Sequence, residues 1–391
     1  MARDIVCLSH LRWDFVYQRP NHLMARAARD RRVFFVEEPV LETAADPGLR
    51  TSVREGVTVV TPVLPDGLDE GETEFALDAL MDRLFRTERI DRPVLWYYTP
   101  MALPWTIRLA ASVVVYDCMD YLAGFRGAPR RLLELEDALI RRADLVFTGG
   151  ASLHRRMTGR HADAHCFPSS VDLAHFRRAR GERPEPADQA AIPRPRLGYA
   201  GVIDERLDLD LIDGVAAARP DVSIVLVGPI VKIDPADVPA RPNVVRLGLK
   251  PYAELPDYLA GWDAGWMPFA RNDATRFISP TKTPEYLAAG LPVVSTTIHD
   301  VVEPYGRLGL VTIADRADET IAAIDAFAAG RRPAAAAVDR FLATGSWDRT
   351  WAAMAELLDE SVGREAAAAR SRLRVSGRLG VGPVPAAPAL D

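Results

Sequence analysis

Short runs of β-branched and aromatic residues alternate with longer segments of helical periodicity along most of this chain. In the first half, these runs predict buried strands at residues 4–8, 32–36, 57–61, 93–98, 112–116 and 145–148. Apolar residues three and four positions apart predict helices between them, at residues 18–30, 74–86 and 130–142. Because strands that alternate with helices build a parallel sheet covered by helices, the pattern predicts an α/β fold.

A proline-rich segment at residues 179–195 interrupts this alternation. It contains Pro184, Pro186, Pro193 and Pro195 among charged residues. Proline at this density supports neither a helix nor a central strand, because its ring fixes the backbone and removes a hydrogen-bond donor. We therefore interpret the segment as a linker between two domains.

The alternation restarts after the linker, with strands predicted at residues 196–199, 222–227, 244–247, 264–268 and 292–295. We predict two Rossmann-like, doubly wound domains, residues 1–178 and 196–345, that face each other across a central cleft. Open parallel sheets bind ligands beyond the carboxyl ends of their strands, so this cleft is the expected two-substrate site. A helix at residues 346–362 follows, and the composition of residues 363–391 predicts a disordered tail.

The richest candidate site is a loop, a helix and a buried strand at residues 277–294. Ser279 and Thr281 lie where the helix begins, and the unpaired N–H groups and dipole of a helix start favour an anion. Lys282 adds a positive charge in the same turn. Glu285, one turn further, can accept hydrogen bonds from two vicinal hydroxyls, such as those of a ribose. The segment therefore suits a nucleoside diphosphate, with helix capping and a surface ion pair as the alternative.

Polar residues after the predicted strands of the first half are candidates for acceptor chemistry. Asp117 and Asp120 follow the strand at 112–116, where a carboxylate could take the proton of an acceptor hydroxyl or could simply cap the next turn. His10 follows the first strand and is either a third catalytic candidate or an ordinary loop histidine. Arg19 and His22, on the first helix, either face the acceptor side of the cleft or have a structural role.

The run from residue 279 to residue 294 resembles the donor-binding segment of GT-B glycosyltransferases, whose common form is S-P-x-K-x-x-E-Y-x-A-x-G-x-P-V-V. Other pieces resemble this group in the same order: A-D-L-V-F-T at 143–148, P-S-S-V-D-L-A-H-F at 168–176, G-Y-A-G-V-I at 198–203, N-V-V-R-L-G at 243–248 and L-P-D-Y-L at 255–259. Residues 13–22, W-D-F-V-Y-Q-R-P-N-H, are similar to the opening of bacterial exopolysaccharide and teichuronic-acid-type transferases. These belong to the glycosyltransferase family 4 and family 1 group.

The resemblance implies transfer of a sugar from a nucleoside diphosphate donor, with a UDP-sugar favoured, to a hydroxyl acceptor in glycan, polysaccharide or glycoconjugate synthesis. It also implies that the helix at 346–362 crosses back to the first domain. The donor-binding residues that it implies are Gly201, Arg206, Gly248, Lys250, Tyr252, Ser279, Thr281, Lys282 and Glu285. Retaining members often carry a second glutamate, whose position is occupied here by Phe277. The donor sugar and the stereochemistry therefore stay open.

Composition and charge narrow the functional classes. With 48% hydrophobic and 26% charged residues and a net charge of -6, the chain is expected to be globular and not to bind nucleic acid. Cys7, Cys118 and Cys166 lack metal-ligand spacing and indicate reduced thiols in the cytoplasm. No apolar run is long enough to span a membrane. Arginine clusters at 26–32 and 364–378 would allow only peripheral contact with an inner membrane face.

No cofactor or required metal is expected. Asp208 and Asp210 have the spacing of a metal-binding D-x-D triplet, but we interpret them as helix caps. Two alternatives to the glycosyltransferase interpretation use the same fold: a nucleotide-sugar epimerase, and a non-catalytic scaffold protein.

Overall fold

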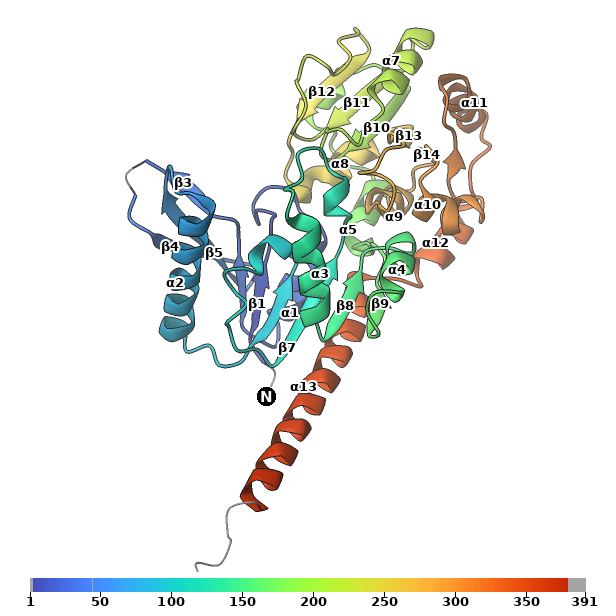
Figure 1. Cartoon of the computed structure of the whole chain (residues 1–391). Helices are drawn as coiled ribbons and strands as arrows, with labels where there is room; N and C mark the ends of the chain where they lie inside the picture. Colours follow the sequence, from blue (N-terminus) through green and yellow to red (C-terminus); the bar gives the residue numbers. More distant parts are fainter. Residues whose placement is uncertain (1–2, 44, 379–391) are drawn as a thin grey trace, which may run out of the picture.

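The computed structural model describes residues 3–43 and 45–378, which form two mainly parallel sheets with helices on their faces (Figure 1). The first sheet has the order β3-β5-β2-β1-β6-β7-β8-β9, with β4 paired to β5, and the second has the order β12-β11-β10-β13-β14-β15. The strands of the first sheet are β1 Ile5–Leu8, β2 Val33–Val36, β3 Val40–Glu42, β4 Gly48–Arg54, β5 Val57–Pro65, β6 Val94–Tyr97, β7 Val113–Cys118, β8 Leu145–Thr148 and β9 Ala164–Cys166. Those of the second are β10 Arg196–Ala200, β11 Ser223–Val227, β12 Val244–Gly248, β13 Ala264–Met267, β14 Val293–Ser295 and β15 Thr312–Ile313.

Helices connect the strands and cover both sheets, which confirms the predicted α/β class. They are α1 Arg19–Ala27, α2 Glu70–Glu88, α3 Leu132–Arg142, α4 Ala151–Thr158, α5 Leu173–Arg177, α6 Ala187–Ala190, α7 Leu209–Ala218, α8 Leu255–Ala260, α9 Lys282–Ala288, α10 His299–Val301, α11 Ala317–Ala328, α12 Ala335–Leu342 and α13 Trp347–Arg378. Short 3-10 or π turns are η1 Pro100–Ala102, η2 Leu122–Gly124, η3 Arg178–Arg180, η4 Tyr252–Glu254 and η5 Val302–Gly306. No described helix is long and apolar enough to cross a membrane.

In the first sheet, the sequence pattern predicted β5 in part but missed the edge strands β3, β4 and β9, of which β4 is the longest. β4 pairs antiparallel with β5, whereas every other strand pair is parallel. β4 is an edge strand in which every residue is at least partly exposed. It therefore lacks the continuous apolar run by which the buried strands are recognised.

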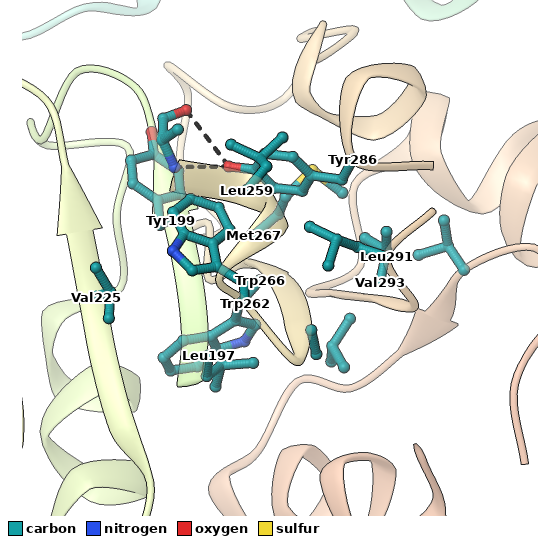
Figure 2. Close-up of a cluster of buried hydrophobic side chains, with 14 of the residues drawn as sticks. Leu197, Tyr199, Val225, Leu259, Trp262, Trp266, Met267, Tyr286, Leu291 and Val293 are labelled. Atoms are coloured by element: carbon teal, nitrogen blue, oxygen red, sulfur yellow. Dashed lines mark hydrogen bonds between the residues drawn. The ribbon is translucent and has the colours of Figure 1, made fainter. Parts of the chain in front are cut away.

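The core of the second domain fixes the position of α9 relative to β10. Figure 2 shows Tyr286 of α9 packed among Trp262, Trp266 and neighbouring aliphatic side chains. The Tyr286 hydroxyl accepts a hydrogen bond of 2.7 Å from the backbone N–H of Ala200, the last residue of β10. Because this buried contact joins the two elements, residues on α9 are held at a fixed distance from the loop that follows β10.

The last helix crosses back to the first domain, as expected, but does not end where we predicted. Trp347, Trp351, Met354 and Leu358 are buried in the core cluster of the first sheet. The predicted end at residue 362 is wrong, because α13 continues to Arg378 and projects away from the domains (Figure 1). The alanine-rich stretch at 366–369 has high helix propensity, which outweighs its lack of apolar periodicity. The rest of the predicted tail, residues 379–391, lies outside the described residues.

Candidate active site

A cleft between the two domains lies beyond the carboxyl ends of β7, β10 and β11. Its inner part is lined from the first domain by Arg19, Met119 and Asp120, and from the second by Tyr199 and Ser279. Its outer part is lined mainly by Tyr17, Gly201, Gly228, Leu249, Tyr252 and Glu285. Gln18, Arg206, Thr281 and Lys282 line both parts. The predicted donor residues therefore come together from three separate loops.

Lys282, the first residue of α9, lies against the loop that follows β10. Its Nζ is 5.5 Å from the centre of the Tyr199 ring. A Cβ on Gly201 would lie 2.2 Å from Lys282 Cε, so only glycine leaves room for the lysine side chain. Burial lowers the pKa of the Lys282 ammonium, and the nearby Glu285 carboxylate opposes that shift. The charge of Lys282 is thus held in a desolvated position where an anion would stabilise it.

Replacing Gly201 by alanine is expected to displace Lys282 and to weaken nucleotide binding by roughly tenfold or more. The backbone at Gly201 has φ +154, and the added Cβ would overlap the lysine stem. Calorimetric titration of the Gly201→Ala variant with UDP would measure this loss. The exposed Gly67, whose Cβ would meet no atom within 4 Å, provides a matched Gly67→Ala control. Equal UDP affinity in the two variants would contradict the proposed packing.

Glu285 lies one turn after Lys282 and faces the outer part of the cleft. Burial raises the pKa of its carboxyl to about 7, while Lys282 and a hydrogen bond from Thr281 act in the opposite direction. Hydrogen bonds from hydroxyl groups would stabilise the ionised form of this buried carboxyl. This property fits the predicted role of Glu285 as acceptor for a ribose.

Arg206 reaches the inner cleft in a fixed orientation. Its guanidinium forms a fork with Asp204, with Nη2 at 2.7 Å from Oδ2 and Nε at 2.9 Å from Oδ1. Burial alone would lower the pKa of Arg206, but Asp204 outweighs it and the pKa is raised. The guanidinium carbon is also 5.4 Å from the ring centre of Phe125, which belongs to the other domain. Asp204 and Phe125 were not among the predicted residues, although Asp204 is only two positions from Arg206.

The two predicted aspartates have different environments. Asp117 is fully buried inside β7 and binds the Arg19 guanidinium through Nη2 at 2.9 Å and Nε at 3.1 Å. Arg19 also donates to the backbone carbonyl of Phe167 at 2.6 Å. Asp120, beyond the strand, lines the inner cleft. We correct the assignment accordingly, because Asp117 is a structural carboxylate whose oxygens are occupied by Arg19.

The environment of Asp120 makes it the better proton acceptor. Burial raises the pKa of its carboxyl, whereas the positive charges of Arg206, Arg19 and Lys282 act against this shift. Asp120 therefore lies near the cationic groups of the cleft, but it forms no ion pair with any residue that the structure describes. Arg19 lines the cleft on the side of the first domain and also has a structural role, because its guanidinium binds Asp117.

His22 is not on the acceptor side. Its ring is 3% exposed and stacks on Trp347 at 4.7 Å between ring centres. Burial, followed by the charge of Arg26, lowers the pKa of its imidazole to about 3. His22 is therefore a neutral aromatic member of the junction between α1 and the start of α13, and its predicted acceptor role is corrected.

Tyr252 joins the same junction from the second domain. Its ring stacks on Tyr17 at 4.5 Å and on His175 at 4.2 Å, so both of its faces are covered. Its hydroxyl is buried without a hydrogen-bond partner among the described residues. A nucleobase in the outer cleft could meet the edge of this ring but could not stack on it.

Of the remaining predicted donor residues, Lys250, Ser279 and Thr281 line the cleft, whereas Gly248 does not. Lys250 lines the outer part but is paired with Asp188 at 2.5 Å. Gly248, with φ +71, ends β12 next to a register shift. Ser279 accepts a 2.5 Å hydrogen bond from Ser169 of the first domain through its backbone oxygen. Thr281 precedes α9 without a side-chain capping bond and lines both parts of the cleft.

Contacts at the margins of the cleft hold the two domains together. The carboxylate of Asp300 accepts a 3.0 Å hydrogen bond from the backbone N–H of Ser152 in the first turn of α4. Phe277 packs edge to face on Tyr121 of the first domain, with 5.4 Å between the ring centres. These contacts join residues more than a hundred positions apart, so no local signal in the sequence could have identified them. Among residues 3–43 and 45–378, no three His, Cys, Asp or Glu side chains gather as a metal site would require.

Comparisons with known proteins agree with this architecture. No protein-family model matches the chain. A Bacillus subtilis protein described as "Putative teichuronic acid biosynthesis glycosyltransferase TuaH" is 28% identical over 224 residues, which cover 53% of this chain and 56% of the relative. The match thus spans little more than half the length of this relative.

Solved structures share the fold over nearly the whole chain. Sucrose-phosphate synthase from Thermosynechococcus elongatus has a TM-score of 0.68 at 15% identity, covering 92% of this chain and 98% of that one. The Anabaena protein Alr3699/HepE, solved in complex with UDP and glucose, has a TM-score of 0.67 at 15% identity, covering 91% and 99%. The predicted GT-B fold, with two Rossmann-like domains facing a cleft, is therefore confirmed.

Proposed function

We propose that this protein is a glycosyltransferase that moves a sugar from a nucleoside diphosphate, preferably UDP, to a hydroxyl acceptor in polysaccharide or glycoconjugate synthesis. The observation that carries this proposal is the convergence of Lys282, Arg206, Gly201 and Glu285 on one interdomain cleft. The GT-B fold and the relative named for teichuronic acid biosynthesis support it. Incubation with a panel of nucleotide sugars tests it, since failure to bind or turn over any of them would refute it.

The cationic side chains of the cleft would stabilise the departing diphosphate. Lys282 is desolvated and Arg206 is fixed by Asp204, so neither needs to reorganise when negative charge develops on the leaving group. Glu285 would hold the ribose hydroxyls. Asp120, on the opposite wall, would orient the acceptor hydroxyl and take its proton as the bond to the sugar forms.

Binding of UDP-glucose is expected to strengthen by about tenfold per pH unit up to about pH 7 and then to level off. Ribose hydroxyls donate to the ionised Glu285 carboxylate, so below its raised pKa binding must first expel a proton. Between the ordinary value of 4.5 and about 7, the folded state binds more protons than the unfolded state. Glu285 therefore contributes less to folding stability as the pH rises through this window.

Calorimetric titration from pH 5.5 to pH 8.5 would measure this profile. A Glu285→Gln variant is the control: it should bind more weakly, show a flat profile and unfold at a higher temperature above pH 7. A sloping profile in that variant would assign the pH dependence to another group.

We also propose that transfer needs neither a cofactor nor a bound metal, because Lys282 and Arg206 supply the positive charge. Dialysis against EDTA is then expected to change the transfer rate by less than about twofold. Removal of a required metal would have a much larger effect, because such a metal supplies several kcal/mol of transition-state stabilisation. Recovery of lost activity by Mg²⁺ or Mn²⁺ would contradict this. Action in the cytoplasm, with peripheral contact to the inner membrane face, remains part of the proposal. In the first arginine cluster Arg26 and Arg31 are buried and pair with Asp348 and Asp359, so this contact would rest on the cluster at 364–378.

A further inference from the structure

A second cavity lies at the joint between the two domains. Its volume is about 270 Å³, and its walls come from both domains. The chain passes it twice: Val171 enters the core of the second domain on the way out, and Leu342 leaves that core on the way back to α13. Other walls are Ser279 and Pro284 of the donor segment and residues 303–305. An occupant would therefore contact both crossings of the chain at once.

This cavity borders the inner cleft but is a separate space. Ser169 and Ser279 line both the cavity and the inner cleft, and the hydrogen bond of 2.5 Å from Ser169 Oγ to the Ser279 carbonyl belongs to the shared wall. Lys282, Arg206 and Glu285 line the cleft and not the cavity. A molecule in the cavity would thus leave the proposed nucleotide site free.

A buried hydroxyl without a partner lines the cavity. Ser170 is 7% exposed, and its Oγ forms no hydrogen bond with any residue that the structure describes. Such a group is stabilised by a partner from outside the chain. A Cβ on Gly345 would lie 3.8 Å from this Oγ, so the missing side chain leaves the space beside the hydroxyl open. His10 Nδ1 is also buried without a partner, but His10 lines neither this cavity nor the cleft, which favours an ordinary loop histidine.

The remaining surface of the cavity is largely apolar. Tyr305 packs edge to face on Phe341, with 5.0 Å between the ring centres, and both rings line the cavity with Val171, Pro284 and Leu342. Small-molecule sites combine apolar walls with a few polar groups that fix orientation, and drug-sized ligands fill about 300–1,000 Å³. The cavity has this character but lies just below that size, so it suits a molecule about as large as one sugar ring.

The charges of the lining select against an anion. The residues that line the cavity include no Lys, Arg or His, whereas Asp300 and Glu303 bring two carboxylates. Each carboxylate already has a partner, because Asp300 accepts a 3.0 Å hydrogen bond from the Ser152 N–H and Glu303 pairs with Arg307. Carboxylate oxygens accept more than one hydrogen bond, so ligand hydroxyls can still donate to them. The lining therefore fits an uncharged ligand rich in hydroxyl groups.

From this geometry we propose that the cavity is a second ligand site, which binds one uncharged pyranose sugar and thereby stabilises the observed arrangement of the two domains. Ser170 and the two carboxylates would bind hydroxyl groups, and Tyr305 and Phe341 would contact the C–H groups of the ring. Binding of the sugar itself is independent of the proposed function. Its coupling to the nucleotide rests on that function, because UDP would also bind between the domains.

The first test is direct binding, measured by saturation-transfer NMR with methyl glucoside and N-acetylglucosamine. At least one of them should bind about tenfold or more tightly than the anion glucuronate. Gly345→Leu, which fills the space beside Ser170, should abolish this binding, and Ser170→Ala should weaken it about fivefold. Gly363→Leu is the matched control, because a Cβ there would meet no atom within 4 Å. Equal binding in Gly345→Leu and the wild type, or tightest binding of the cation glucosamine, would overturn the proposal.

The second test is linkage to the nucleotide. A saturating concentration of the bound sugar should strengthen UDP binding about fivefold in the wild type and in Gly363→Leu, but not in Gly345→Leu. Unchanged UDP affinity in the wild type would refute the effect on domain arrangement. If the wild type binds no UDP at all, the proposed function fails, whereas the sugar site is still decided by the NMR measurement.

Discussion

Replacing Lys282 by methionine is expected to reduce kcat/KM for sugar transfer by about 100-fold or more while leaving the fold intact. Lys282 is the cation closest to the Gly201 loop, and its charge is held in a desolvated position. Its removal would leave the departing diphosphate without its main counter-charge. Methionine keeps an unbranched side chain as far as the ε position, so it removes the Nζ that lies over Tyr199 and leaves the rest of the side-chain volume beside Gly201 filled.

The stability of this variant separates a functional loss from a structural one. Burial disfavours the charged form of Lys282, so the free energy of unfolding should stay unchanged or rise when the charge is removed. Urea denaturation would measure this quantity alongside steady-state kinetics. Arg331→Met controls for the loss of one positive charge in the same domain. A variant that transfers sugar at the wild-type rate would refute the assigned role of Lys282.

Replacing Asp117 by asparagine is expected to lower the free energy of unfolding by about 3–5 kcal/mol. The substitution leaves the buried charge of Arg19 without its carboxylate partner. The asparagine keeps one acceptor oxygen, but its NH2 group faces the guanidinium where the second carboxylate oxygen accepted a hydrogen bond. Asp120→Asn is the matched control, because it makes the same chemical change at an aspartate three residues later that lines the cleft. It should cost less than about 1 kcal/mol of stability and reduce transfer strongly.

A double variant, Arg19→Met with Asp117→Leu, checks the physical reason. Replacing both members of a buried ion pair by apolar groups is often neutral, so most of the lost stability should return. The opposite pattern, with Asp117→Asn stable but inactive, would restore the original catalytic assignment of Asp117.

The donor half of the site could be predicted because its signal is local. Lys282 and Glu285 lie within one helical turn, and Gly201 and Arg206 follow one strand, so each pair is positioned by a single element. The α/β class followed equally from continuous apolar runs such as β11. The edge strand β4 escaped prediction because its residues are at least partly exposed and carry no apolar pattern.

The acceptor half could not be predicted in the same way, because the surroundings of its side chains are formed by residues far away in the sequence. The predicted strand ended at residue 116, which placed Asp117 in a loop, whereas β7 continues to Cys118 and buries it. Its partner Arg19 is 98 positions away. His22 and Trp347 meet only because α13 returns to the first domain. A single sequence records the residue types but not these pairings.

A crystal structure of the protein with UDP tests the central claim most directly. We expect the diphosphate to lie within hydrogen-bonding distance of Lys282 Nζ and the Arg206 guanidinium, with the ribose hydroxyls on the Glu285 carboxylate and the base beside Gly248 and Lys250. A nucleotide bound elsewhere, or bound in this cleft without contacting Lys282 or Glu285, would contradict it.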